Sequence, residues 1–300
     1  DMADSVHPND SGYGKMADTW ASAIQAYLPT ICSSDEPFVY DVSLDASSTN
    51  NYETDDLFCS YTLAGTATTS ATAWVVDGSP QMNLYMPFEG GAANALLDIS
   101  GNDHVVSAQS DPSWSATGGF DGNGYFDLDG NDYFNAGTVM PTNAAYTKAA
   151  WVYWIPGNNM NNILSGQSGH AFWITQYPEN TGDVYLSAGH QDPWRGVKDT
   201  AVFTPNTWIH VAVTYDYNTS TMVLYRNGVE VDSSSSITPS ADARAYIGAF
   251  SGNYHFKGYI DDVRIYDRAL SSQQIAALYN VGTGDADTIV SQETAVGEDW

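Results

Sequence analysis

The sequence predicts a mainly β protein whose strands form an antiparallel sandwich or barrel. Between residues 124 and 266, short runs alternate apolar and polar side chains, and no helical pattern interrupts them. Asn227-Gly228 stands between two of these runs and is a preferred sequence for a two-residue hairpin turn. Hydrophobic residues make up 43% of the chain and aromatic residues 13%, which argues against disorder. The length of 300 residues suits two domains, or one large β domain with appendages.

The chain is expected to begin with a loop and a helix within residues 1–31. Apolar side chains recur there at helical spacing, candidate N-caps precede them, and Pro29 ends the pattern. After a linker at 32–36, residues 37–80 contain three short runs with strand character. These runs are Phe38–Leu44, Leu57–Leu63 and Thr72–Val76.

From about residue 83 to residue 280 the pattern is β throughout, apart from one helix at the end. The predicted strands are Gly124–Leu128, Tyr133–Ala136, Ala149–Ile155, Ala171–Tyr177, Asp183–Ala188, Trp208–Tyr215, Thr221–Arg226, Val229–Ser233, Arg244–Ala249 and Tyr259–Tyr266. A helix is expected after them, because Ser271 and Gln274 form a capping-box pattern ahead of an apolar run. Residues 281–300 are polar and acidic, so they are expected to form a tail or linker.

The charge balance restricts the partners of the chain. Nine Lys and Arg residues against 36 Asp and Glu residues give a formal net charge of −27. Nucleic acids and anionic membranes are bound through clustered basic residues, which this chain lacks. No apolar run is long enough to span a bilayer. The acidity fits the solubility of an extracellular protein, and a few carboxylates are candidates for binding Ca²⁺.

Cys32 and Cys59 are the two cysteines, and they allow a single internal disulfide. That bond would close a loop of about 28 residues and stabilise the fold by about 3–4 kcal/mol. The alternative is a pair of free thiols in a reducing compartment. Scarce cysteines with many Gly, Ser, Thr, Asn and Tyr residues favour a secreted surface protein. The chain opens at Asp1 without a signal peptide, so we expect a mature or fragmentary chain from which an upstream part was removed.

Six segments, in order along the chain, carry a family pattern. They are Asn83–Gly90, Asp98–Asn102, Phe126–Tyr133, Trp208–Tyr215, Leu224–Gly228 and Tyr259–Tyr266. Residues 83–280 thereby resemble the laminin-G-like, concanavalin A-like jelly-roll family found in bacterial surface proteins. The resemblance implies two curved antiparallel sheets, often with a structural Ca²⁺. Members of that family bind glycans or proteins, or serve as spacers.

A second resemblance concerns residues 1–28. Asp4 and His7 stand in the sequence Asp-Ser-Val-His-Pro-Asn, which is followed by Gly-Tyr and the predicted helix. This pattern resembles the segment that closes SGNH (GDSL-type) ester hydrolases. There His7 would act as the general base and Asp4 would fix its tautomer. The chain lacks the serine nucleophile and oxyanion-hole motifs of that family, so it is not expected to be an enzyme by itself.

A third resemblance concerns residues 37–80. The stretch from Asp56 to Tyr61, followed by Trp74, resembles the opening strands of bacterial immunoglobulin-like domains. We therefore expect a partial immunoglobulin-like β segment before the jelly roll. An unpaired edge of such a segment could accept a strand from another chain.

Glu89 and Asp261 are the candidate calcium ligands, with Asp98 as a weaker third. The jelly-roll resemblance implies that an acid near the first strand and one in the last strand meet at a metal ion with backbone carbonyls. Asp98 can equally form an Asx-turn within Asp-Ile-Ser-Gly-Asn.

Strand alternation bears on the surroundings of Asp261. It places Asp261 on one face with Val263 and Ile265, and Asp262 on the other face with Arg264. A bare carboxylate on a buried face is costly, which favours a cation partner. The alternative is an ion pair with arginine and no metal.

The loop Gly189–Gly196 is the candidate glycan site. A sugar ring can stack on Trp194, and its hydroxyl groups need polar partners, for which the loop offers His190, Gln191, Asp192 and Arg195. The alternative is that Trp194 belongs to the core. The paired carboxylates on one strand face that jelly-roll glycosidases use are absent.

The leading functional hypothesis is a secreted, non-catalytic adhesion or glycan-binding module that belongs to a larger surface protein. Its partners would be a glycan or a surface protein. A second hypothesis is a structural subunit of an extracellular assembly, whose partner would be further copies of the chain. A third is the C-terminal part of an SGNH-type ester hydrolase, for which an upstream domain would supply the nucleophile.

Overall fold

The computed structural model describes most of residues 82–281 and short parts of the chain on either side. The described residues are 38–46, 57–64, 75–76, 79–80, 82–158, 160–176, 182–190, 196–281 and 288–289. The chain divides into two compact units, residues 71–283 and residues 1–70 with 284–300. The helix predicted within residues 1–31 lies outside the described residues. No helix in the described part of the chain is long and apolar enough to cross a membrane.

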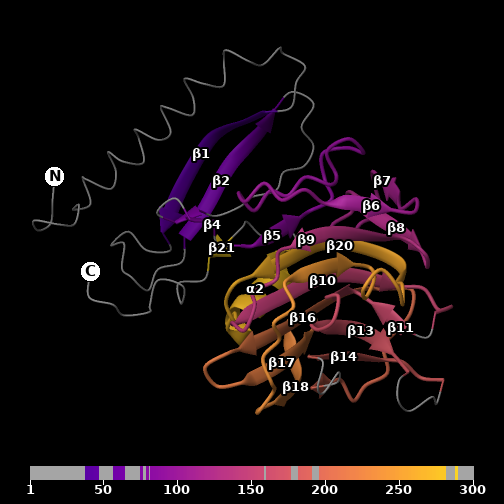
Figure 1. Cartoon of the computed structure of the whole chain (residues 1–300). Coiled ribbons are helices and arrows are strands. Elements are labelled where there is room, and N and C mark those ends of the chain that lie inside the picture. The colour runs from indigo at the N-terminus through magenta and orange to yellow at the C-terminus, as the bar shows by residue number, and fades with distance from the viewer. Residues whose placement is uncertain are drawn as a thin grey trace, which may run out of the picture. The chain divides into compact units, whose positions relative to one another are not determined.

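An eight-stranded antiparallel sheet forms one layer of the larger unit (Figure 1). Its strands are β5 (Leu84–Met86), β7 (Ser113–Ser115), β8 (Tyr125–Asp129), β10 (Tyr146–Trp154), β16 (Trp208–Asp216), β17 (Thr221–Arg226), β18 (Val229–Ser234) and β20 (Lys257–Tyr266). The strand order is β18-β17-β16-β10-β20-β8-β7, and β5 also pairs with β20. The pattern predicts all of these except β5 and β7, because three residues are too few to show an alternation.

Two four-stranded sheets form the second layer. In spatial order the first contains β11 (Met160–Asn162), β13 (Ala171–Thr175), β14 (Tyr185–Gly189) and β15 (Val197–Lys198). The second contains β12 (Leu164–Ser165), β19 (Arg244–Ile247), β9 (Tyr133–Thr138) and β6 (Ser107–Gln109).

One hydrophobic core joins the two layers. Phe126 and Ile260 of the large sheet and Phe134 and Phe172 of the second layer belong to the same buried cluster. The rings of Phe126 and Phe134 meet edge to face, with centroids 4.8 Å apart, across the two layers. The predicted mainly β antiparallel sandwich is therefore confirmed.

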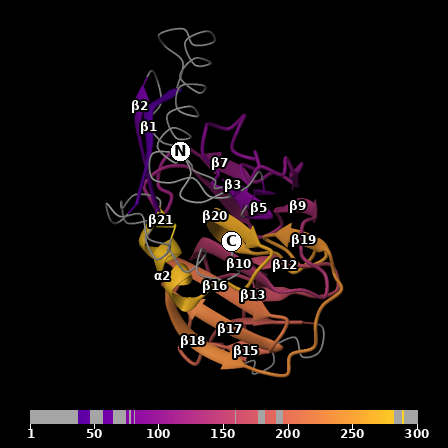
Figure 2. The ribbon, with the colours of Figure 1, turned by 90° about the vertical axis from the view of Figure 1, so that its left-hand side faces the viewer.

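A second, smaller core lies on the outer face of the large sheet, under the helix α2 (Ser272–Val281) (Figure 2). The predicted capping box is confirmed. The amide N–H of Ser271 donates to Gln274 Oε1 at 2.8 Å, and the amide N–H of Gln274 donates to Ser271 Oγ at 3.2 Å. Ile275 on this helix is fully buried. The helix α2 is the single helix in the described part of the chain.

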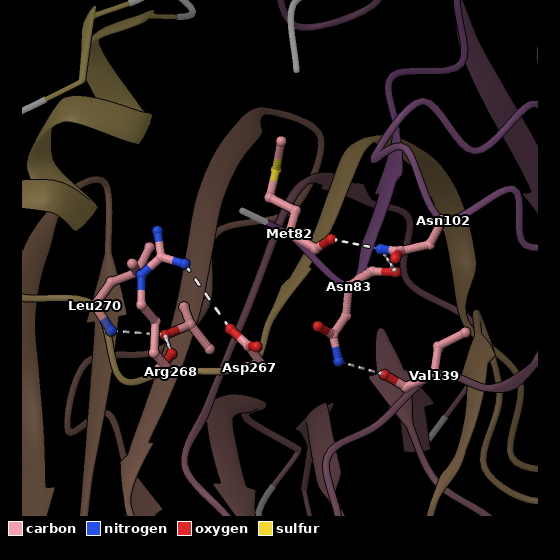
Figure 3. A network of polar contacts seen from close by, with 8 residues as sticks. Met82, Asn83, Asn102, Val139, Asp267, Arg268 and Leu270 are labelled. Carbon is pink, nitrogen blue, oxygen red and sulfur yellow. Dashed lines mark hydrogen bonds and ion pairs between the residues drawn. The ribbon is translucent and has the colours of Figure 1, made fainter. Parts of the chain in front are cut away.

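Two polar side chains also fix the segments that lead into and out of the sheet (Figure 3). Thr147 Oγ1 donates to the carbonyl of Arg268 at 2.8 Å and accepts the amide N–H of Leu270 at 2.9 Å. Asn83 Nδ2 donates to the carbonyl of Val139 at 3.2 Å. Buried backbone groups outside the regular ladders thus obtain partners from side chains.

Asn227 and Gly228 form the turn between β17 and β18, as predicted. Their φ angles are 51° and 75°. Positive φ at both positions is typical of a type I′ turn, whose twist matches that of the paired strands.

The smaller unit contains β1 (Phe38–Ala46), β2 (Leu57–Ala64) and β21 (Thr288–Ile289) in one sheet. The first two confirm two predicted strands. β21 pairs with β2, so two residues of the segment 281–300, which was expected to form a tail or linker, belong to this sheet. A two-residue strand carries no periodicity, which is why the pattern does not predict it.

The third predicted strand of residues 37–80 belongs elsewhere. β3 (Val75–Val76) pairs with β4 (Ser79–Pro80), and both fall in the unit of residues 71–283. The prediction that residues 37–80 form one segment is therefore wrong at its C-terminal end. The immunoglobulin-like character of β1 and β2 stays a prediction.

Candidate functional site: a carboxylate cradle and an aromatic row

Glu89 and Asp261 hold the same loop, residues 118–124, from two sides. Glu89 follows β5, and its Oε1 accepts the amide N–H of Gly124 at 2.9 Å. Asp261 is buried in β20, where its Oδ2 accepts the amide N–H of Phe120 at 3.2 Å. The structure therefore brings the two predicted calcium ligands to one loop.

Oxygen atoms converge beside Gly119 in that loop. A Cβ atom at this position would lie 2.5 Å from Asp261 Oδ2, 2.6 Å from the carbonyl oxygen of Gly124 and 3.0 Å from that of Asn123. Side chains larger than glycine would collide with these oxygens, so the position is restricted to glycine. Glu89, Asp261 and the carbonyls of Asn123 and Gly124 are called the cradle below. Carboxylate and carbonyl oxygens are the donors that Ca²⁺ prefers, so the donor set of this cradle fits the ion.

The electrostatics of the cradle also favour a cation. Burial, followed by the charges of Asp262, Asp121 and Glu89, raises the pKa of Asp261 well above its usual value. However, no group of three or more His, Cys, Asp or Glu side chains placed to hold a metal occurs among the described residues. Backbone carbonyls would have to supply most of the ligands.

Asp98 does not join this cradle, contrary to the predicted set of three ligands. Its Oδ1 accepts the amide N–H groups of Tyr85 and Ser100, at 3.0 and 2.9 Å. Its Oδ2 accepts the hydroxyl of Ser100 at 2.9 Å and the amide N–H of His104 at 3.1 Å. Four donors occupy this carboxylate, which favours the alternative of an Asx-type loop clamp.

A β-bulge in β20 makes the predicted alternation around Asp261 wrong. The register with β10 shifts between Ala149 and Trp151, and Asp262 has a φ of 50°. The extra residue places Val263 in the core between the layers, together with Ile260, so Asp261 points to the outer face.

Asp262 forms the predicted alternative, an ion pair with arginine. Its Oδ1 accepts Arg264 Nε at 3.1 Å and Nη2 at 3.0 Å. Arg264 Nη2 also donates to the hydroxyl of Tyr85 at 2.9 Å. The arginine therefore pairs with Asp262, and Asp261 keeps only amide N–H partners among the described residues.

The predicted glycan loop is described only at its start, because Gln191, Asp192, Trp194 and Arg195 lie outside the described residues. His190 was predicted to be a polar partner for a sugar in this loop, but it is only 2% exposed. Its Nδ1 lies 2.5 Å from the carbonyl of Thr238, and its Nε2 lies 3.0 Å from the hydroxyl of Tyr146. Since a carbonyl only accepts, Nδ1 carries the proton and Nε2 accepts from the tyrosine. Trp173 on β13 is also buried, at 8% exposed.

His190 belongs to a polar group inside the sandwich. Its ring centroid lies 5.1 Å from that of His170, whose two ring nitrogens have no hydrogen-bond partner among the described residues. Lys148 is fully buried beside them and donates to the carbonyls of Leu164 and His170, at 2.9 and 2.7 Å. Burial lowers the pKa of Lys148 well below its usual value, and Asp242 opposes this effect.

A row of aromatic side chains on the outer face is absent from the sequence-based predictions. Trp208, Tyr153 and Tyr259 pair directly across β16, β10 and β20, and Asp127 on β8 continues the row. Tyr125 lies two residues before Asp127 on the same face. All five side chains are partly exposed. Aromatic residues at alternating strand positions are the sequence signal, but the pairing that unites them is non-local.

The remaining predicted residues cannot be placed. Asp4, His7 and Cys32 lie outside the described residues, and Cys59 lies in β2. The hydrolase assignment and the disulfide stay predictions.

Comparison with known families and structures agrees with the sandwich. Residues 128–276 match the family described as the concanavalin A-like lectin/glucanases superfamily. The match does not extend to residues 1–28 or 37–80, where the other two resemblances lie. No curated protein matches the chain.

Among solved structures, domain 4 of AbnA, an extracellular arabinanase from Geobacillus stearothermophilus, matches with a TM-score of 0.54 and 22% identity. The alignment covers 66% of this chain and 98% of that domain, which was solved in complex with arabinotriose. The receptor-binding domain of botulinum neurotoxin D matches with a TM-score of 0.51 and 16% identity, covering 67% of this chain and 53% of that one. The binding domain of Paraclostridial Mosquitocidal Protein 1 gives 0.50 and 13%, with 68% and 53% covered. This chain thus spans about half the length of the toxin binding domains.

At these identities the similarities show the fold alone. The match of residues 128–276, the strand order and the single core between two layers agree with them, so the larger unit of this chain has a concanavalin A-like jelly-roll fold.

Proposed function

We propose that the jelly roll is an extracellular, non-catalytic glycan-binding module. The observation that carries this proposal is the similarity of fold to nearly the whole of AbnA domain 4, which was solved in complex with arabinotriose. The arabinanase is extracellular, which agrees with the composition of this chain. The net charge of −27 supports a glycan in preference to nucleic acid. A protein receptor on a surface is the alternative partner.

A glycan array tests this function. We expect the full chain, with millimolar Ca²⁺ present, to bind a subset of oligosaccharides that includes arabinose-containing ones. Soluble arabinotriose should compete with the array for the protein. If no glycan on an array of neutral and acidic oligosaccharides retains the protein, the proposal is wrong.

We also propose that the cradle at Glu89 and Asp261 binds a structural Ca²⁺. The converging oxygens beside Gly119 and the raised pKa of Asp261 support this proposal. The ion would neutralise the buried carboxylate and fix loop 118–124. The side chains of Glu89 and Asp261 and the carbonyls of Asn123 and Gly124 are the candidate ligands.

Thermal unfolding tests the calcium site. Adding Ca²⁺ should raise the Tm of the wild-type chain, because a ligand that binds only the folded state stabilises it. Asp261→Asn should abolish this rise. Asp98→Asn is the matched control, since it removes a carboxylate charge from a loop clamp and should leave the calcium response intact. A wild-type Tm that does not respond to Ca²⁺ would contradict the site.

A further inference from the structure

The aromatic row forms a continuous strip across four neighbouring strands of the large sheet. Trp208 pairs with Tyr153, Tyr153 with Tyr259, and Tyr259 with Asp127. Tyr125 packs beside the row, 4.7 Å from Tyr259 and 6.0 Å from Trp208 between ring centroids. The strip lies on the face opposite the core between the layers, since none of its members belongs to that core.

The rings of this strip contact one another. The centroids of Tyr153 and Tyr259 are 4.9 Å apart with an interplanar angle of 22°, and those of Tyr153 and Trp208 are 5.9 Å apart. Rings at these separations leave no space between them for an ammonium group, so the strip is not a cage for a quaternary amine. Tyr153 and Tyr259 stack on each other and cover part of each other's faces, so the strip is a platform that offers the outer parts of these rings as an apolar surface to a sugar ring.

Polar groups without partners accompany the rings. Among the described residues, no hydrogen bond involves the carboxylate of Asp127 or the hydroxyls of Tyr125, Tyr153 and Tyr259. Burial, followed by the charges of Asp132 and Asp129, raises the pKa of Asp127. A half-buried carboxylate without donors is complementary to the hydroxyl groups of a sugar that lies on the adjacent rings.

The charges around the platform select the class of glycan. Lys257 pairs with Asp129 across β20 and β8, on the same face and next to the row. Asp127 and Asp129 outnumber this lysine, so the platform carries a net negative charge. Together with the net charge of −27, this charge disfavours glycans that carry carboxylate or sulfate groups.

We propose that the row of Trp208, Tyr153, Tyr259 and Asp127 is the binding surface for an uncharged oligosaccharide that lies across the strands. This inference rests on the proposed glycan-binding function and assigns it to the sheet face instead of the loop at Trp194. The outer parts of the Tyr153 and Tyr259 rings supply apolar contact, and Asp127 accepts hydrogen bonds from the sugar hydroxyls.

Calorimetric titration with arabinotriose and with trigalacturonate tests the platform. We expect the wild-type full chain to bind arabinotriose and to bind the charged trisaccharide at least tenfold more weakly. Tyr259→Leu should weaken arabinotriose binding at least tenfold, because it removes the central ring. Tyr259→Phe keeps the ring and should retain most of the affinity, which separates a lost platform from a misfolded chain.

Two further variants locate the site. Asp127→Asn should weaken binding several-fold, whereas Tyr217→Leu, which removes an exposed tyrosine from the β16–β17 turn, should leave it unchanged. If arabinotriose binds and Tyr259→Leu binds as well as the wild type, while Trp194→Ala does not bind, the loop is the site and this inference is wrong although the proposed function stands. Preferential binding of trigalacturonate also overturns it. If the wild type binds neither trisaccharide nor any glycan on the array, the proposed function fails as well.

Discussion

Arg264→Leu is expected to lower the free energy of unfolding by about 3–5 kcal/mol, because it leaves the carboxylate of Asp262 buried without its cation. The two side chains are 10% and 9% exposed and lie 3.0 Å apart. The guanidinium also lies over the ring of Tyr85, 4.3 Å from its centroid, and donates to its hydroxyl. Leucine replaces none of these contacts. Chemical denaturation of the wild type and the variant at pH 7 measures the loss.

The matched control is the exposed pair of Arg268 and Asp267 (Figure 3). These groups are 3.9 Å apart, and Asp267 is 62% exposed. Asp267→Ala should change the free energy of unfolding by less than about 1 kcal/mol, since water and salt screen exposed pairs.

A double variant separates the cost of an orphaned charge from that of lost packing. Asp262→Asn in the Arg264→Leu background removes the unpaired charge and should recover part of the stability. Asparagine also tolerates the positive φ of this position. A loss below about 1 kcal/mol for Arg264→Leu alone would contradict the role assigned to the pair.

Local interactions explain which parts of the fold the sequence predicts. The turn at Asn227-Gly228 and the capping box of Ser271 and Gln274 involve neighbouring residues, and both are found as expected. Most strands of the sandwich were equally predictable, because each carries its own alternation. Strands of two or three residues, such as β5 and β21, obtain their partners from distant segments and leave no such pattern.

The candidate sites show the same division. Glu89 and Asp261 were predictable from the family resemblance, and the structure brings them to one loop. The face on which Asp261 lies was not predictable, because one bulge residue at Asp262 reverses the alternation of β20. The aromatic row was missed because its members lie on four strands that are distant in sequence, and only the register unites them.

Acid is expected to destabilise the jelly roll strongly, because buried histidines are held neutral. Burial lowers the pKa of His210 to about 3, and the charge of Arg264 adds to this effect. Burial also lowers the pKa of His190 to about 4, together with Lys148, while the carbonyl of Thr238 opposes it. Burial, Lys148 and His190 lower the pKa of His170 well below its usual value. The folded state therefore binds fewer protons than the unfolded chain, whose histidines titrate near pH 6.5.

The sign follows from this difference. Stability is complete above about pH 6.5 and falls as the pH drops toward the pKa values of the folded state. Between pH 7 and pH 4, His190 and His210 should each cost about 3 kcal/mol, which is a large fraction of the 5–15 kcal/mol typical of a domain. Asp261 acts in the opposite direction, because its raised pKa means that protonation relieves a buried charge as the pH falls.

His210→Gln isolates one of these contributions, since glutamine stays neutral at every pH. The side chain of His210 packs edge to face against Trp151, and its Nδ1 has no partner among the described residues, so the exchange removes no bond from that atom. Denaturation at pH 7 and at pH 4 should show the variant losing about 3 kcal/mol less than the wild type over this range. Equal losses in the two proteins would mean that His210 titrates near its ordinary pKa in the folded state. The ring resonances of His210 in an NMR titration would then move near pH 6.5 instead of near pH 3, because a side chain that protonates as easily folded as unfolded cannot link folding to pH.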